Sequence, residues 1–341
     1  MTALLWFSSA QAGFDDSYKA FQAENYPAAL TEAHKAAEGG DPRAYYLLGL
    51  MYQGGRGVPA DKTEAFNWFQ KAANGGIAGS FARLGWAYVR GEGTAQDVSK
   101  ALDLARLSAR ANDPEGQFLV HLCLTFDALG YFDEHGKVDN GKYWRLASRS
   151  VSERELDSEA MDSLYLAAER NFPMAVSTLA LSFGGMIGEG NRKKMVGLIQ
   201  KIAGQRLPGI ERYEKISQYM DTLGESLASP QLFADAQTSV GVMALLKACG
   251  VNETPPSSAA SSLKQVSMTI SRPLRDSAYL PSRVPGYERS YLLAGAWTEE
   301  WKYEACGKTA VVSVVFTADG LGGAMFVTSQ SGAGIAGIGA K

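Results

Sequence analysis

The chain has 341 residues, of which 46% are hydrophobic and 20% are charged. These values are typical of a globular protein with a sizeable core, and the length allows more than one domain. The formal net charge of -3 and the lack of a basic block argue against nucleic acid or an anionic membrane as the main partner.

The first twelve residues contain a short apolar segment, Ala3–Phe7, followed by small residues at Ala10 and Ala12. Signal peptidase cleaves after such a small-x-small pattern, although the charged start of a secretory signal is missing. We interpret residues 1–12 as the remnant of a signal peptide, which predicts a bacterial periplasmic or secreted protein. The alternative is the apolar start of a first helix in a cytoplasmic protein. No apolar run approaches about 18 residues, so the sequence predicts no transmembrane segment.

A repeat with a period of 36 residues follows. Ala36-Ala37 recurs at Ala72-Ala73, and Leu48-Gly49 recurs at Leu84-Gly85. The same shift relates Tyr52 to Tyr88, Gly55 to Gly91, Gly57 to Gly93, Asp61 to Asp97 and Ala65 to Ala101. Agreement at this many positions indicates an array of supersecondary units, each of which buries its apolar face against its neighbours.

Each unit is predicted to contain two helices. The first covers Arg43–Gln53, where apolar residues recur at helical spacing, and the glycines and proline of residues 54–59 end it. Asp61 is the candidate N-cap of the second helix, with Glu64 placed three residues later as in a capping box. We expect this helix to bury Ala65, Trp68, Phe69, Ala72 and Ala73.

The small residues Gly49 and Ala65 predict close approach of two helix backbones. Trp68 and Phe69 would then fill the space between neighbouring units.

These residues resemble the Sel-one-like repeat, a relative of the tetratricopeptide repeat. The positions that carry the resemblance are Gly49, Tyr52, Gly55, Gly57, Ala65, Trp68 and Ala72, and then Gly85, Tyr88, Gly91, Gly93 and Ala101. Residues 80–109 form a slightly altered second copy, and degraded units extend over about residues 15–228. The resemblance implies a mainly α, superhelical solenoid that binds a protein or peptide on its concave face.

The last third differs in periodicity. Ile210–Leu227 and Pro230–Ala248 are predicted to close a helical region that covers residues 13–250. Residues 251–285 are rich in proline and serine and predict a linker and an extended segment. Alternation at residues 297–304, with two further runs at 309–317 and 323–329, predicts a small antiparallel β module over residues 286–341, of about three strands.

The three cysteines allow one disulfide. Cys123 lies in an apolar helical stretch, whereas Cys249 and Cys306 both lie at the edges of elements and form the better pair. Such a bond would join the helical region to the C-terminal segment. The alternative is two unrelated thiols, because sequence does not determine connectivity.

Residues 332–337 match G-x-G-x-x-G, but no helix follows to bind a phosphate, so we interpret this tail as a flexible end. His34, His121 and His135 show no metal-binding or catalytic spacing. The sequence therefore predicts no metal, no cofactor and no enzymatic activity.

The candidate partner-binding residues are Tyr45, Tyr46, Arg56 and Arg90. Tyrosine and arginine are frequent at interaction surfaces, although the favoured interpretation of the two arginines is solvated loop charges, and the tyrosines have packing as their alternative. The favoured hypothesis is a non-enzymatic scaffold of the bacterial cell envelope. The alternative is an envelope regulator or assembly factor whose β module binds a biosynthetic complex or a glycan, with Trp297 and Trp301 stacking on sugars unless they are core residues.

Overall fold

The computed structural model describes residues 13–125, 151–188, 190–201, 210–250, 261–319, 323–330 and 333–337. The chain forms two compact units, one of Met1–Leu146 with Glu159–Phe172 and one of Ala147–Ser158 with Pro173–Lys341. The predicted signal-peptide remnant lies outside the described residues, as do His135 and residues 251–260 of the predicted linker. Among the described residues, no helix has the length and apolar character needed to cross a bilayer.

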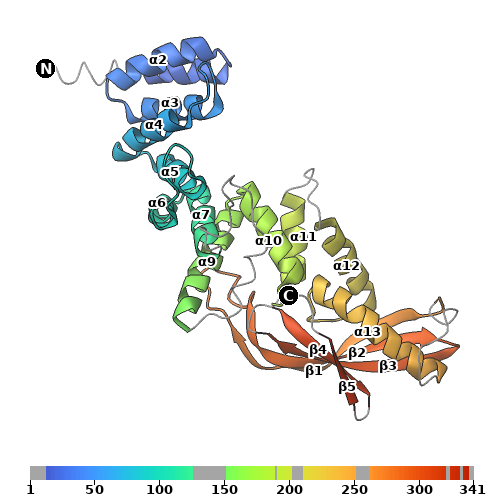
Figure 1. Cartoon of the computed structure of the whole chain (residues 1–341). Helices are drawn as coiled ribbons and strands as arrows, with labels where there is room; N and C mark the ends of the chain where they lie inside the picture. The colour runs from blue at the N-terminus through green and yellow to red at the C-terminus, as the bar shows by residue number, and fades with distance from the viewer. Residues whose placement is uncertain are drawn as a thin grey trace. The chain divides into compact units, whose positions relative to one another are not determined.

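The first unit is a stack of antiparallel helix pairs (Figure 1). Helices α3 (Pro42–Gly54) and α4 (Lys62–Asn74) form one pair, and α5 (Ala78–Arg90) and α6 (Val98–Arg110) form the next, with every boundary shifted by 36 residues. The other helices of the unit are α2 (Tyr26–Glu38), α7 (Pro114–Thr125) and the part of α9 (Val151–Glu169) that begins at Glu159. The predicted repeat solenoid is confirmed.

Each pair is joined by a loop that the repeat residues shape. Gly55 and Gly91 end α3 and α5 in the left-handed conformation, with φ of 64° and 68°. Asp61 caps α4 by accepting the N–H groups of Thr63 and Glu64. The reciprocal bond of the predicted capping box is not formed, because the N–H of Asp61 donates to the carbonyl oxygen of Tyr52 instead, at 3.0 Å.

The second glycine of each loop permits close contact with the preceding unit. A Cβ atom on Gly93 would lie 2.2 Å from the carbonyl oxygen of Lys62, and one on Gly57 would lie 2.9 Å from that of Tyr26. Both glycines have positive φ, of 73° and 78°. These positions therefore require glycine for two reasons, conformation and space.

Gly49 has a different role from the one predicted. A Cβ atom there would lie 2.5 Å from the ring of Phe69, so this glycine accommodates an aromatic ring rather than a helix backbone. In the next unit Gly85 accommodates the side chain of Leu119 in the same way, at 2.5 Å. The alanines Ala65, Ala72 and Ala101 are buried, as expected of repeat positions.

The second unit combines helices with a five-stranded antiparallel sheet in the order β1-β2-β3-β4-β5. The helices are α10 (Pro173–Gly185), α11 (Asn191–Lys201), α12 (Ile210–Leu223) and α13 (Pro230–Cys249). The strands are β1 (Lys264–Tyr279), β2 (Leu292–Ala305), β3 (Lys308–Ala318), β4 (Ala324–Gln330) and β5 (Ala333–Gly337).

The sheet is larger than the sequence predicted. Strand β1 occupies residues predicted as a linker, because Pro273 lies on an edge strand, where a missing N–H breaks no ladder. The glycine-rich tail was predicted to be flexible, but residues 333–337 form β5 and pair with β4. The predicted three-strand module over residues 286–341 is therefore corrected to a five-stranded sheet that begins at Lys264.

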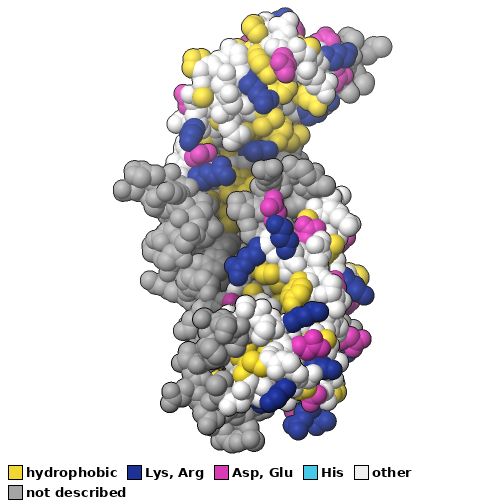
Figure 2. All heavy atoms as spheres, turned by 90° about the vertical axis from the view of Figure 1, so that its right-hand side faces the viewer, with side chains coloured by type: hydrophobic (Ala, Val, Ile, Leu, Met, Phe, Trp, Pro, Cys, Tyr) yellow, Lys and Arg dark blue, Asp and Glu magenta, His cyan; other side chains and the backbone are white. Residues whose placement is uncertain are grey.

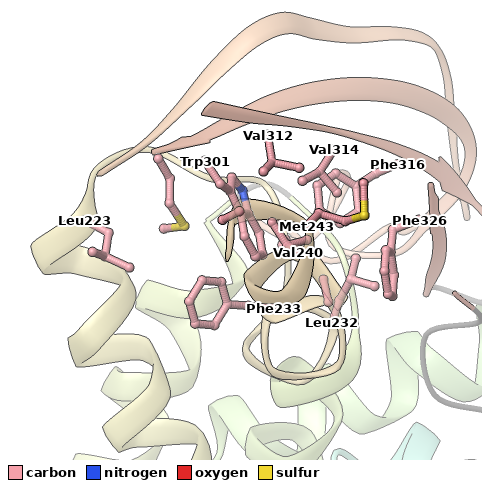
Figure 3. Packing of buried hydrophobic residues seen from close by; sticks show 14 of the residues in the cluster. Leu223, Leu232, Phe233, Val240, Met243, Trp301, Val312, Val314, Phe316 and Phe326 are labelled. Carbon is pink, nitrogen blue, oxygen red and sulfur yellow. The ribbon is translucent and has the colours of Figure 1, made fainter. Parts of the chain in front are cut away.

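Helix α13 covers one face of this sheet. Phe233 packs against Trp301 with ring centroids 5.0 Å apart, and Val240 and Met243 of the same helix meet the valines of β3 (Figure 3). Helices α10 and α11 belong to the same unit as the sheet. One contact that joins α11 to the rest of the unit is the hydrogen bond that Asn191 donates to the carbonyl oxygen of Ser290, at 2.8 Å. The helical region predicted over residues 13–250 is thus divided, with Pro173 onward in the unit that contains the sheet.

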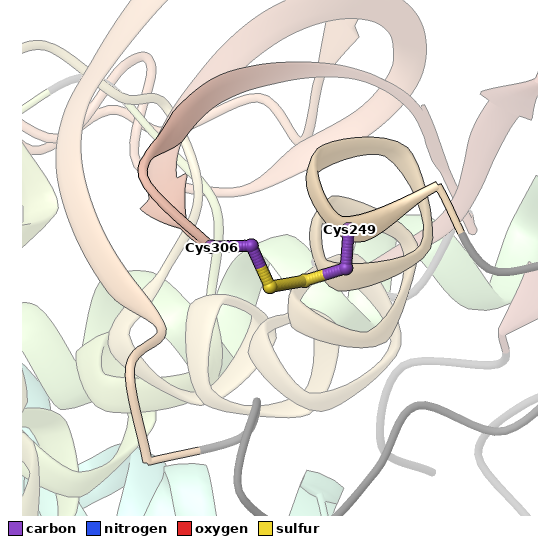
Figure 4. Close-up of a disulfide and its surroundings, with 2 residues drawn as sticks. All are labelled: Cys249 and Cys306. Carbon is purple, nitrogen blue, oxygen red and sulfur yellow. A yellow bond between two sulfur atoms is a disulfide. The ribbon is translucent and has the colours of Figure 1, made fainter.

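A disulfide joins Cys249 to Cys306, with Cα atoms 5.4 Å apart (Figure 4). It connects the C-terminal end of α13 to the tight turn between β2 and β3. Cys306 has φ of 50° and Gly307 has φ of 69°, as in a two-residue hairpin turn. The structure thus forms the pairing that the sequence favoured.

Candidate partner-binding surface

Basic side chains lie over aromatic rings along the helices of the first unit. Lys71 is 3.9 Å from the ring centroid of Trp68, and the guanidinium of Arg90 is 4.5 Å from that of Trp86. On the visible face, hydrophobic side chains gather among Lys and Arg over the N-terminal helices (Figure 2). Lys71 and Arg90 are exposed, so each pair presents a cation held over an aromatic ring, which suits recognition of another protein.

A strip of neighbouring side chains crosses the first helices of consecutive pairs, α3, α5 and α7. We call it the Tyr46 strip, and it consists of Tyr46, Arg83, Trp86, Arg90 and Glu115. The ring centroids of Tyr46 and Phe69 are 5.7 Å apart, and Tyr46 also acts on Arg83 by raising the pKa of its guanidinium. Gly79 provides the space for this tyrosine, since a Cβ atom there would lie 3.2 Å from its hydroxyl oxygen.

An ion pair lies at the centre of the Tyr46 strip. Nη2 of Arg83 is 3.1 Å from Oε2 of Glu115, and both side chains are mostly shielded from solvent. Burial raises the pKa of Glu115 above its ordinary value, although the positive charge of Arg83 opposes this shift. Burial acts to lower the pKa of Arg83, but Glu115 and Tyr46 outweigh it and hold that pKa above its usual range. Neighbouring side chains therefore act on both members of the ion pair, Tyr46 on Arg83 and Arg90 on Glu115.

Trp86 and Arg90 complete the Tyr46 strip. The indole of Trp86 is buried and acts to lower the pKa of Glu115, while Arg90 covers the indole ring from the exposed end of α5. Arg90 also acts electrostatically on Glu115, lowering the pKa of that carboxyl group. The strip therefore presents an exposed guanidinium on a rigid support.

The other two predicted residues lie in different surroundings. Tyr45 is half-buried and stacks on Trp68 at 5.9 Å, beside His34, whose ring is 5.8 Å from the same indole. Arg56 is exposed and lies 5.1 Å from the ring centroid of Phe21. The structure therefore brings Tyr46 and Arg90 together and leaves Tyr45 and Arg56 outside the strip.

Sequence reasoning missed Arg83 and Glu115. Neither matches a repeat position, and their pairing is not local, because they belong to the first helices of consecutive pairs. One signal could have found them. Arg83 and Glu115 are separated in sequence by nearly one repeat period, which places them on helices of neighbouring repeats.

The described residues contain no cluster of three or more His, Cys, Asp or Glu side chains able to hold a metal ion. His121 is buried, with Nδ1 at 3.0 Å from the carbonyl oxygen of Ala160, and burial lowers its pKa to about 4. Burial also raises the pKa of the Cys123 thiol to about 12, which disfavours the reactive thiolate.

The two tryptophans of β2 are core residues. Trp297 and Trp301 are 1% and 0% exposed, so neither can stack on a sugar, and the glycan hypothesis based on them is wrong. Both indole N–H groups donate to the carboxylate of Glu299, each at 2.9 Å. The hydroxyl of Ser226 and the N–H of Leu227 donate to the same group, at 2.8 and 2.9 Å.

Comparison with known proteins places the repeats in a family. The model of the Sel1 repeat matches residues 42–77 and 82–113. A Sel1 repeat protein from Oxalobacter formigenes is 30% identical, and the match covers 34% of this chain and 94% of that one, with a TM-score of 0.30. The protective antigen c5321 of uropathogenic Escherichia coli, which displays an SLR fold, is 23% identical over 68% of this chain and 46% of its own, with a TM-score of 0.44. No curated protein matches this chain.

Proposed function

Because the chain belongs to the Sel1 repeat family, we propose that it is a non-enzymatic scaffold that binds a protein or peptide along the first helices of its repeats. Sel1 repeat proteins are generally protein-interaction scaffolds, and the family is typically non-catalytic. The proposal for this chain adds a binding surface and a compartment to that general role.

The observation that carries the proposal is the Tyr46 strip. Its side chains come from the first helices of consecutive repeats, α3, α5 and α7, and contact one another or their neighbours through aromatic and cation–π contacts and the Arg83–Glu115 ion pair. A partner that docks on a strip already fixed in place loses little side-chain entropy. Tyrosine, tryptophan and arginine are also the residues that contribute most to binding energy at protein interfaces. We place this strip on the concave face of the repeat stack.

The bacterial cell envelope is the proposed location. The disulfide between Cys249 and Cys306 supports it, because such bonds persist in oxidising compartments and are rare in the cytosol. The small-x-small pattern at Ala10 and Ala12 supports it as well. Localisation of the natural protein with its disulfide state trapped by a thiol-alkylating reagent tests this part. A reduced protein in the cytosol would contradict it.

The binding surface is tested with a matched pair of arginine variants. Partners are captured from the native compartment and identified, and their Kd is then measured for each variant. Arg90 and Arg110 are the last residues of α5 and α6, and both are exposed, but only Arg90 belongs to the Tyr46 strip. Arg90→Ala is expected to raise Kd about tenfold or more, and Arg110→Ala to leave it unchanged. Equal effects, or no effect of Arg90→Ala and Tyr46→Ala, would exclude this surface.

A further inference from the structure

The face of the sheet opposite α13 is apolar along β3 and β4. Val311 and Val315 of β3 are 43% and 36% exposed, and Met325 and Val327 of β4 are 47% and 38% exposed. Val315 and Val327 are direct cross-strand partners, and Met325 pairs with Thr317 on the same face. Val315, Met325 and Val327 are therefore neighbours, and Val311 lies on the same side of the sheet beyond Ser313; we call these four residues the β3–β4 face.

This patch departs from what a sheet covered on one side requires. An antiparallel sheet of this kind normally alternates apolar residues toward the core with polar residues toward water. Strand β2 follows the rule, because its outward residues include Glu300, Lys302 and Glu304, all exposed, while Trp301 and Tyr303 between them are buried. Strands β3 and β4 break the rule at adjacent positions. Contiguous apolar patches of this kind mark interaction sites in soluble proteins.

The charges beside the patch indicate its occupant. Glu300, Lys302 and Glu304 alternate in sign along β2, and Lys302 is the cross-strand partner of Val311. A two-fold interface brings a patch against itself, so it needs an apolar centre and a flank that carries both signs. The β3–β4 face has both features, whereas a strongly acidic or basic partner would find no matching charge.

We propose that the β3–β4 face packs against the same face of a second copy of this chain. The interface is sheet on sheet, with the side chains of the two faces interdigitating as in a β-sandwich. Association through the β1 edge is disfavoured by the structure, because that strand carries Pro273 and several register shifts, the usual protection of an exposed edge. The face, and not this edge, is the self-association site.

The test is the mass in solution of the full chain with its disulfide intact. The expected result is a dimer by sedimentation velocity, and a monomer or an at least tenfold weaker dimer for Val327→Lys. Val242→Lys is the matched control, because Val242 is also 43% exposed but lies on α13 rather than on the sheet. This control is expected to dimerise like the natural chain. Circular dichroism checks that each variant is folded.

A second measurement does not depend on disrupting the interface. Val315→Cys treated with a short bis-maleimide is expected to give a covalent dimer, since a two-fold axis near the patch brings both copies of the residue together. Val242→Cys should not. A natural chain that stays monomeric up to roughly 100 μM would overturn the proposal, because a Kd above that value is too weak for a stable interface. A dimer unaffected by Val327→Lys, or equal crosslinking of both cysteine variants, would overturn it as well.

Discussion

The two units of this chain are held together in different ways. In the first unit the contacts that shape the loops repeat with the period of the sequence, as when Asp61 and Asp97 both donate their N–H groups to a tyrosine carbonyl oxygen at 3.0 Å. In the second unit the decisive contacts join residues far apart in the chain, such as Ser226 with Glu299 and Cys249 with Cys306. A stack of local units tolerates damage to one element, whereas a core of long-range contacts is expected to fail as a whole.

The largest effect is expected at Glu299. This carboxylate is buried and accepts hydrogen bonds from Trp297, Trp301, Ser226 and Leu227. Glu299→Ala leaves these donors unsatisfied and should destabilise the second unit by about 3–5 kcal/mol. Hydrogen exchange read by mass spectrometry should show lost protection in α13 and β2 but not in α4 and α5. Loss of protection in both units together would show that they unfold as one body.

The disulfide should have the next largest effect. It closes a loop with a sequence separation of 57 residues, and the stabilisation by such a disulfide is typically about 2–4 kcal/mol. Reduction, or the double substitution Cys249→Ala with Cys306→Gly, should lower the free energy of unfolding of the second unit by the same amount. The denaturant midpoint of that unit should fall accordingly. Glycine is chosen at residue 306 because φ is 50° there. An unchanged midpoint after verified reduction would mean that packing against α13 alone holds the hairpin.

Acid should weaken the first unit through His121. Burial lowers the pKa of this histidine from 6.5 to about 4 in the folded protein. The unfolded chain therefore binds a proton between these values while the folded chain does not, so stability is lost as the pH falls through this window. The loss approaches about 3 kcal/mol near pH 4. Hydrogen exchange of α7 against pH measures it, and His121→Gln should remove this part of the dependence. An identical profile in the variant would assign the loss to other groups.

A smaller effect distinguishes backbone strain from steric clash at the glycines of the repeats. Gly93 and Gly76 have φ of 73° and 84°, so alanine at either position costs about 1–2 kcal/mol in backbone strain. Only at Gly93 would the added Cβ meet a backbone oxygen, while nothing lies within 4 Å at Gly76. Gly93→Ala should therefore be worse than Gly76→Ala by about 1–2 kcal/mol in denaturant unfolding. Equal losses would mean that the loop moves away freely.

The repeat stack was predictable because its determinants are local. Gly55, Asp61 and Gly91 act within a few residues of their own positions, and the 36-residue period made them visible twice. The boundaries of α3 and the start of α4 were predicted to within a residue for the same reason. The sequence alone did not determine which cysteines pair. The pairing depends on the packing of α13 on the β2–β3 hairpin.

The rest depended on contacts that have no local signal. Pro273 suggested a linker, because a sequence does not say that the strand carrying it lies at an edge. Glu299 resembled one more polar residue in an alternating strand, although its burial follows from donors 72 and 73 residues away. In the candidate site Tyr46 and Arg90 were identified, but Arg83 and Glu115 between them were not, since their ion pair joins two helix pairs.

Site-specific photocrosslinking in the native compartment tests the central claim, that the repeats bind a protein through the Tyr46 strip. Gln53 lies seven residues after Tyr46 and therefore on the same side of α3, while Asn67 lies on α4, and both are exposed. A photoreactive residue at position 53 is expected to capture a protein partner, and Arg90→Ala should abolish the product. The same residue at position 67 should capture little of that partner. Equal capture at both positions, or capture at position 53 that survives Arg90→Ala, would contradict the account.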